Sequence, residues 1–527
     1  MPELFQHFLF LLAALYLVVI VHEAGHAVTG KALGFVVTSV GLGTARLFFI
    51  LPIGRTRFYL GLIQPFQGLT FAFLPRPCHG WRRQAAFVAG GIAANALCAA
   101  TSLCVALCLP AGSLATFCSM FAAVNAFFAA LNLIPVSMHV GGGMLRSDGR
   151  LLLDTIRTGS MTPLPPDVIQ TALGCRRLWQ AIGDRLMHRL CTFGAALSWI
   201  DLGSTAKAES LFSEAAAIDG AHPYIDWLES VTRTNLALAK GELAEASAAL
   251  AQAESLRESA TAEGRYLLAL LRANLLQNEG KPGEALAAFE RLSVDPVGEC
   301  CPGLGLSALT NHLRAACVAG DQAAVAALHA RYETRQRHLP SDLRDLHAYG
   351  ALARFASSRG ADAQDDYRRA LKAIAALAAP WRDADDKAAF IDAQQGLIEE
   401  ARQALDPESV APLIEAIEAH RPDHALRTRD KSCRRWSLLL MLINVVSFVP
   451  LVLVALAIGR PHGAPALVLA ALLALFTLLG AFYLLLDLIV GKLLPSLKQS
   501  SGVILLTLAV MPWFGGLFFA CFAMLLP

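Results

Sequence analysis

The chain has 527 residues, of which 55% are hydrophobic and 16% are charged, with a net charge of +2. The low charge and high apolar content exclude a disordered chain and argue against a wholly soluble one, and the near-neutral balance predicts no nucleic-acid partner. Residues 161–430 hold 65 of the 86 charged side chains. This distribution predicts two apolar blocks in the lipid bilayer around one soluble block.

The first predicted membrane helix covers residues 4–28 and contains the sequence Val21-His22-Glu23-Ala24-Gly25-His26, an HExxH motif. Residues i and i+4 share one face of a helix, so both imidazoles can bind one Zn²⁺, with Glu23 beside them as general base. The alternative is an interfacial cluster where the helix leaves the bilayer. Ionisable groups inside a membrane are energetically costly, which favours a functional site.

The next apolar block is residues 84–145, a run of 62 residues without Asp, Glu, Lys or Arg. A span needs about 20 residues, so the run can hold two. The sequence Pro110-Ala-Gly-Ser113 predicts a tight hairpin between them. The second of these spans closes with Asn132-Leu-Ile-Pro135, and Ser147-Asp148-Gly149 follows. Catalytic zinc needs a third protein ligand, and the candidates lie at this end of the block.

These motifs together resemble the site-2 protease family of intramembrane zinc metalloproteases. That family pairs HExxH on one span with an NxxP…DG motif on a later one. The resemblance covers residues 1–160 and implies that His22, His26 and Asp148 are the zinc ligands and that Glu23 is the catalytic base.

Two further stretches are similar to the family. Gly91-Ile-Ala-Ala-Asn95 resembles its GPxxN motif, with Ile92 in place of proline. The resemblance implies that Asn95 and Asn132 bind the substrate backbone, and the alternative is a hydrogen bond that joins two spans. Residues 36–73 resemble the family's β-hairpin region, which pairs with an extended substrate.

The sequence also departs from the family. Twelve residues, 136–147, separate Pro135 from Asp148, where the family usually has four. This insertion contains His139, an alternative third ligand. We favour Asp148 because the Asp-Gly pair is intact and leads into an apolar helix. The family's usual PDZ domain is missing.

The soluble block carries an internal repeat. Its glycines recur every 38 to 40 residues, at Gly203, Gly241, Gly280, Gly320 and Gly360. Each unit is predicted to be a helix, a glycine turn and a second helix, which resembles a tetratricopeptide-type solenoid with a period longer than the usual 34. Stacked repeats of this kind commonly bind peptides, so we expect a protein or peptide partner here. The alternative is an irregular helical bundle.

Three further uncharged stretches, residues 436–459, 463–486 and 499–527, raise the predicted number of spans to six. The Lys and Arg residues flanking the spans place the N-terminus outside and the repeats in the cytosol. We therefore predict an all-α polytopic membrane protein with a small β-hairpin region and a soluble α-solenoid, in a bacterial inner membrane. Its parts are a three-span zinc protease core (1–160), a cytosolic repeat domain (161–430) and three C-terminal transmembrane helices (431–527).

The predicted function is that of a zinc endopeptidase that cleaves the transmembrane helices of protein substrates, including single-pass ones, near the cytosolic face, as in regulated intramembrane proteolysis. The alternative is a non-proteolytic membrane anchor that displays the repeats as an adaptor. The complete His/Glu/His/Asp set favours the enzyme, because an adaptor has no use for it.

The predicted topology can be tested with reporter fusions. A reporter at Gly280 should be active in the cytosol and one at His462 outside, because positively charged flanks stay in the cytosol. Reporter activity on each side of the membrane is the measurement, and the opposite pattern would overturn the predicted orientation.

Overall fold

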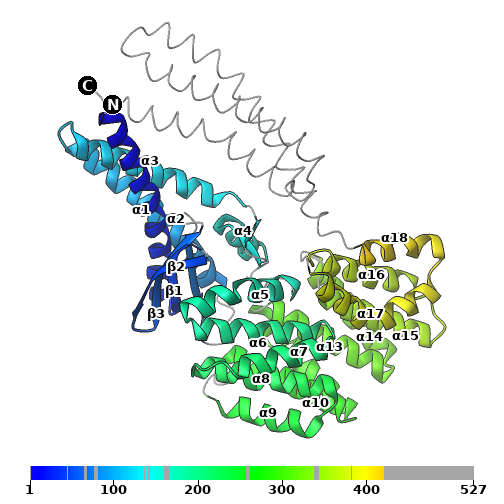
Figure 1. Ribbon diagram of the computed structural model, residues 1–527. Coiled ribbons are helices and arrows are strands. Elements are labelled where there is room, and N and C mark those ends of the chain that lie inside the picture. Colours follow the sequence, from blue (N-terminus) through cyan, green and yellow to red (C-terminus); the bar gives the residue numbers. More distant parts are fainter. Residues whose placement is uncertain are drawn as a thin grey trace. The chain divides into compact units, whose positions relative to one another are not determined.

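The structure, a computed structural model, describes residues 2–419 except 44, 64–67, 76–80, 136, 141–142, 159–164, 257–260, 301, 338–342 and 382 (Figure 1). The described part is mostly helical, with one four-stranded sheet and a two-stranded hairpin. The chain forms two compact units: one includes Met1–Gly25 and Gly91–Asn132, the other His26–Gly90 and Leu133–His420. The three predicted C-terminal spans lie outside the described residues and stay predictions.

Within the described residues, three helices are long and apolar enough to cross a membrane. They are α1 (Pro2–Ala32), α2 (Trp81–Cys108) and α3 (Ser113–Leu133). The predicted break between two helices is confirmed, because α2 ends before Pro110 and α3 begins after it. Helix α3 ends just before Pro135, since proline disfavours helical backbone in the residue that precedes it.

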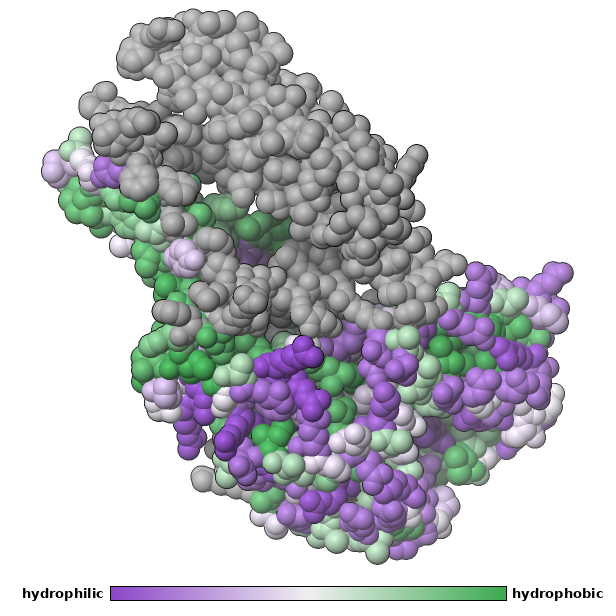
Figure 2. All heavy atoms as spheres, viewed as in Figure 1, coloured by the Kyte–Doolittle hydropathy of each residue, from purple (hydrophilic) through white to green (hydrophobic). Residues whose placement is uncertain are grey.

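The outer surfaces of these helices suit contact with lipid. Several of their large apolar side chains are exposed, among them Leu97 at 70%, Leu107 at 64% and Leu114 at 61%. Figure 2 shows hydrophobic residues gathered over this part of the chain, whereas the visible face of the repeats is mostly hydrophilic. Such extended apolar surface is uncommon on a soluble protein.

The region after α1 is a sheet of four strands and not a simple hairpin. Its strands are β1 (Val36–Leu42), β2 (Ala45–Ile53), β3 (Thr56–Ile63) and β4 (Gly68–Phe73), in the order β2-β3-β1-β4. β1 runs parallel to β3, and the other neighbouring pairs are antiparallel. Gly43 allows a close approach to β3, because a Cβ there would lie 2.7 Å from the Gly61 carbonyl oxygen.

The sheet packs against the first helices of the repeats, α5 (Pro165–Ile182) and α6 (Arg185–Asp201) (Figure 1). Tyr59 lies against Leu178 and Ile182. The Ser39 hydroxyl donates to the Asp184 carboxylate, which also caps α6 by accepting from the Met187 amide at 3.1 Å. The sheet and the repeats therefore belong to one folded unit, which the sequence did not predict.

The remaining helices follow in pairs. They are α7 (Thr205–Ala216), α8 (Pro223–Lys240), α9 (Leu243–Ser255), α10 (Ala262–Asn278), α11 (Pro282–Ser293), α12 (Pro296–Cys300), α13 (Pro302–Ala319), α14 (Gln322–Gln336), α15 (Leu343–Ser358), α16 (Gln364–Ala378), α17 (Ala384–Ala404) and α18 (Pro407–Glu418). All five glycines of the repeat pattern have φ between 66° and 87°. This left-handed conformation ends one helix and turns the chain into the next.

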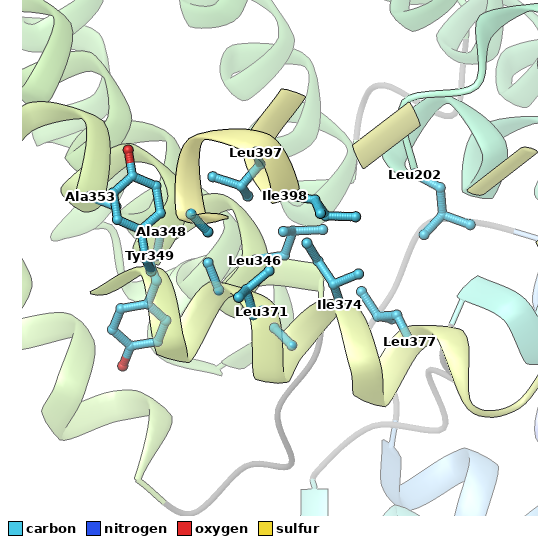
Figure 3. Close-up of a cluster of buried hydrophobic side chains, with 14 of the residues drawn as sticks. Leu202, Leu346, Ala348, Tyr349, Ala353, Leu371, Ile374, Leu377, Leu397 and Ile398 are labelled. Atoms are coloured by element: carbon cyan, nitrogen blue, oxygen red, sulfur yellow. The ribbon is translucent and has the colours of Figure 1, made fainter. Parts of the chain in front are cut away.

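The core of the repeats is apolar and closely packed. Leu371, Ile374 and Leu377 on α16 are fully buried, and Figure 3 shows them packed with side chains from α15 and α17. The rings of Trp199 and Trp381 stack at 5.0 Å between centroids and join α6 to the start of the last helix pairs. Burial of this kind supplies most of the stability of stacked helix pairs.

Three buried histidines of the repeats make their stability depend on pH. Burial lowers the pKa of His188, His222 and His312 below the ordinary 6.5. The neutral form is also required at His222, because its Nδ1 accepts from the Tyr224 amide at 3.2 Å. A group whose pKa is lower in the folded state binds a proton more readily when unfolded. The contribution of such a histidine to the free energy of unfolding is therefore full above pH 6.5 and is lost as the pH falls below that value.

We predict that the melting temperature of the full chain falls between about pH 7 and about pH 5. In His222→Asn, the asparagine keeps a capping acceptor and removes one titrating group, so the fall should be smaller. Thermal unfolding followed by circular dichroism measures this. A pH dependence as steep in the variant as in the wild type would contradict the assignment for His222.

Candidate metal centre

His22 and His26 lie one turn apart on α1 and share one of its faces. Both are buried, with 5% and 6% of their surfaces exposed, and Glu23 is 6% exposed. The helix is continuous here because the residues up to Ala32 are largely apolar and include no proline after Pro2. The HExxH motif is therefore held by a regular helix, with its three ionisable side chains buried.

The ring of His26 is oriented by the backbone of α2. Its Nδ1 lies 2.9 Å from the carbonyl oxygen of Phe87. A carbonyl can only accept, so Nδ1 carries the proton and Nε2 is the nitrogen that can bind a metal. Gly30 permits this approach, because a Cβ there would lie 3.0 Å from the Phe87 ring.

The ring of His22 is oriented by Asn95, which is fully buried on α2. The Asn95 amide nitrogen donates to the Val18 carbonyl at 3.3 Å, which leaves its oxygen to accept from His22 Nδ1 at 3.0 Å. The Nε2 atom of His22 is therefore also the nitrogen that can bind a metal. Partners of this kind fix the tautomer of metal-ligating histidines.

Asp148 completes the group. Its Oδ2 lies 3.2 Å from Nε2 of His26. One ligand atom each from His22, His26 and Asp148 lies within 4.8 Å of the other two, and together these residues can hold a metal ion. The side chain of Asp148 is 15% exposed, which leaves an approach from outside the protein.

The position of Asp148 depends on the segment that precedes it. The twelve-residue insertion forms an antiparallel hairpin of β5 (Ser137–Val140) and β6 (Gly143–Arg146), whose ends lie side by side. Such a hairpin returns the chain to where it left, so the insertion does not carry Asp148 away from the end of α3.

Ser147 then anchors Asp148. Its hydroxyl donates to the Ile134 carbonyl at 2.7 Å and accepts from the Arg150 amide at 3.2 Å. The second bond caps helix α4 (Asp148–Thr158), which begins at the ligand itself. One serine thus joins the end of the NxxP segment to the first turn of the helix that carries the carboxylate.

The other predicted residues have different surroundings. Asn132 lies in the last turn of α3, where its amide donates to the Phe128 carbonyl of its own helix at 3.0 Å. The substrate-binding roles of Asn132 and Asn95 stay predictions, and the observed bonds of Asn95 favour orientation of His22. His139 lies on β5 opposite Met144, and its side chain is outside what the structure describes. The sequence does not indicate the Phe87 carbonyl as the partner of His26, because every residue has a backbone carbonyl.

No family model matches the chain, and neither a curated protein nor a solved structure matches it. The chemistry of this centre must therefore be argued from the donor atoms and their surroundings.

We predict that Asp148→Ala loses most of the bound metal of the purified full chain, because it removes one of three ligands. His139→Ala should lose much less. Asn95→Ala should weaken metal binding about 10- to 100-fold, as is usual for partners of ligating histidines. Elemental analysis of the purified variants measures this. If the His139 change alone strips the metal, Asp148 is not the third ligand.

Proposed function

We propose that the protein is an intramembrane zinc endopeptidase that cleaves transmembrane helices of membrane-protein substrates at or near the cytosolic face. The observation that carries the proposal is the group of His22, His26 and Asp148, in which the two histidines lie with Glu23 on a helix apolar enough to span a membrane. In this proposal the chain lies in a bacterial inner membrane, with its N-terminus outside and its repeats in the cytosol.

The donor set suits zinc better than Ca²⁺ or Mg²⁺. Two imidazole nitrogens and one carboxylate leave one tetrahedral position open, as in catalytic zinc sites, whereas Ca²⁺ and Mg²⁺ prefer oxygen ligands alone. Two ligands of a tetrahedral zinc lie roughly 3.3 Å apart, given bonds of about 2.0–2.1 Å. The observed 3.2 Å between His26 Nε2 and Asp148 Oδ2 fits this spacing.

The reaction follows from the roles of the chain's own side chains. When bound, zinc supplies a Lewis acid that polarises the scissile carbonyl and lowers the pKa of water. The Glu23 carboxylate accepts a proton from the attacking water as the new carbon–oxygen bond forms. The same carboxyl group then donates that proton to the amine nitrogen as the carbon–nitrogen bond breaks. Asn95 and the Phe87 carbonyl keep both imidazoles in the tautomer that binds metal.

A helical substrate must first be extended, because its own hydrogen bonds shield the peptide bond. The sheet has two edges, β2 and β4, to which an extended segment can add as a further strand. Strand β2 suits an apolar segment better, since Phe49, Ile50 and Leu51 are all at least 39% exposed. We propose that β2 holds the unwound substrate.

Glu23→Gln should keep the metal and the fold but lower the rate of cleavage by about 10²–10⁴-fold, because glutamine cannot accept the proton. The measurement compares the membrane proteome of cells that make the wild type with that of cells that make the variant, together with metal content. Uncleaved substrates should accumulate with the variant. Near-normal cleavage would refute the role of Glu23, and a metal-loaded wild type without any cleavage would favour the adaptor.

A further inference from the structure

The repeats contain a cavity that the proposed protease chemistry does not use. It lies among α13, α15 and α17, has a volume of about 210 Å³ and is partly open to solvent. Its lining includes Arg314, His347, Arg354, Gly350, Gly396 and Leu397. None of these residues belongs to the metal centre.

The cavity is positively charged. Two guanidinium groups and one imidazole line it, and no carboxylate does. Outside the lining, Glu400 accepts from Arg354 Nε at 2.8 Å. Arg314 donates to the neutral Asn311 side chain at 3.3 Å, and it forms no ion pair with any residue that the structure describes. Two like charges thus line one cavity, of which Arg354 is paired with Glu400, and the lining itself favours an anion.

Small and apolar residues give the cavity its shape. Leu346 and Leu397, both labelled in Figure 3, join its lining to the apolar core beneath. A Cβ at Gly396 would meet no atom within 4 Å, so this side is open, whereas one at Gly350 would lie 3.2 Å from Leu397. Pockets for drug-sized ligands are about 300–1,000 Å³. A cavity of about 210 Å³ suits a single side chain or a chain end.

We propose that this cavity binds a carboxylate of an acidic peptide. A guanidinium group matches a carboxylate with two parallel hydrogen bonds, and Arg314 and Arg354 line the same cavity. The cavity opens between stacked helix pairs, an architecture whose surface accommodates extended peptides. The proposal assigns the repeats a recognition chemistry, and it holds whether or not the metal centre is a protease.

Fluorescence anisotropy of labelled hexaglutamate on the purified full chain, in a non-ionic detergent, tests the proposal. Arg314→Gln and Arg354→Gln should each weaken binding about tenfold or more, as expected for loss of a charged hydrogen bond. Arg291→Gln is the matched control, because Arg291 is exposed on α11 and, among the residues that the structure describes, bonds only to the Ala287 carbonyl of its own helix. Equal weakening by the control would overturn the proposal.

A second pair of variants avoids any loss of arginine packing. Gly396→Glu places a carboxylate at the open side of the cavity and should abolish hexaglutamate binding, whereas Gly396→Gln, of equal size, should keep it. Equal loss in both would contradict recognition by charge, and this pair decides the matter if an arginine variant does not fold.

Two comparison ligands identify the group that is bound. Hexaglutamine with a free C-terminus binds only if the C-terminal carboxylate of the peptide occupies the cavity. Its binding would support the proposed site and identify the chain end as the bound group. Displacement of the peptide by inorganic phosphate at equal or lower concentration would overturn the carboxylate assignment. Failure of hexaglutamate to bind the wild type would refute the proposal outright.

Discussion

Two hydrogen bonds between α1 and α2 determine what the metal centre can do. A buried imidazole N–H needs an acceptor, and the Nδ1 atoms of His22 and His26 bond to the Asn95 side chain and to the Phe87 carbonyl. Both bonds engage Nδ1, so both histidines present Nε2. The close helix packing that allows the second bond depends on the absence of a side chain at Gly30. The same two hydrogen bonds therefore set the tautomer and the orientation of both imidazole rings and join α1 to α2.

The third member of the group, Asp148, is positioned by a segment far from the histidines in sequence. Asp148 lies 122 residues from His26 in sequence, and its place depends on a hairpin that closes on itself and on the two bonds of Ser147. The segment before the Asp-Gly pair is longer than in the site-2 protease pattern. The hairpin and the Ser147 bonds explain how the pair still lies beside the end of α3. The anchoring bonds involve the Ser147 side chain and two backbone groups, and neither bond uses a side chain of the hairpin.

Local patterns in the sequence were enough to predict where several helices and turns lie, but not the contacts between distant segments. The helical spacing of HExxH, the stop before Pro135 and the left-handed glycines between repeat helices follow from the backbone preferences of single residues. The parallel pairing of β1 with β3 and the bond between Ser39 and Asp184 join distant segments and have no such local signal. Asn95 was recognised as significant, but its bond to His22 required the packing of two helices.

The proposal depends on zinc being bound by the two imidazoles of α1 together with the Asp148 carboxylate at the start of α4. X-ray absorption at the zinc edge of the purified full chain tests it most directly, because the chain also has 12 cysteines that would capture adventitious zinc. The account predicts nitrogen and oxygen ligands at about 2.0–2.2 Å and no sulfur. A sulfur ligand at about 2.3 Å, or a chain purified without zinc that does not take it up, would contradict it.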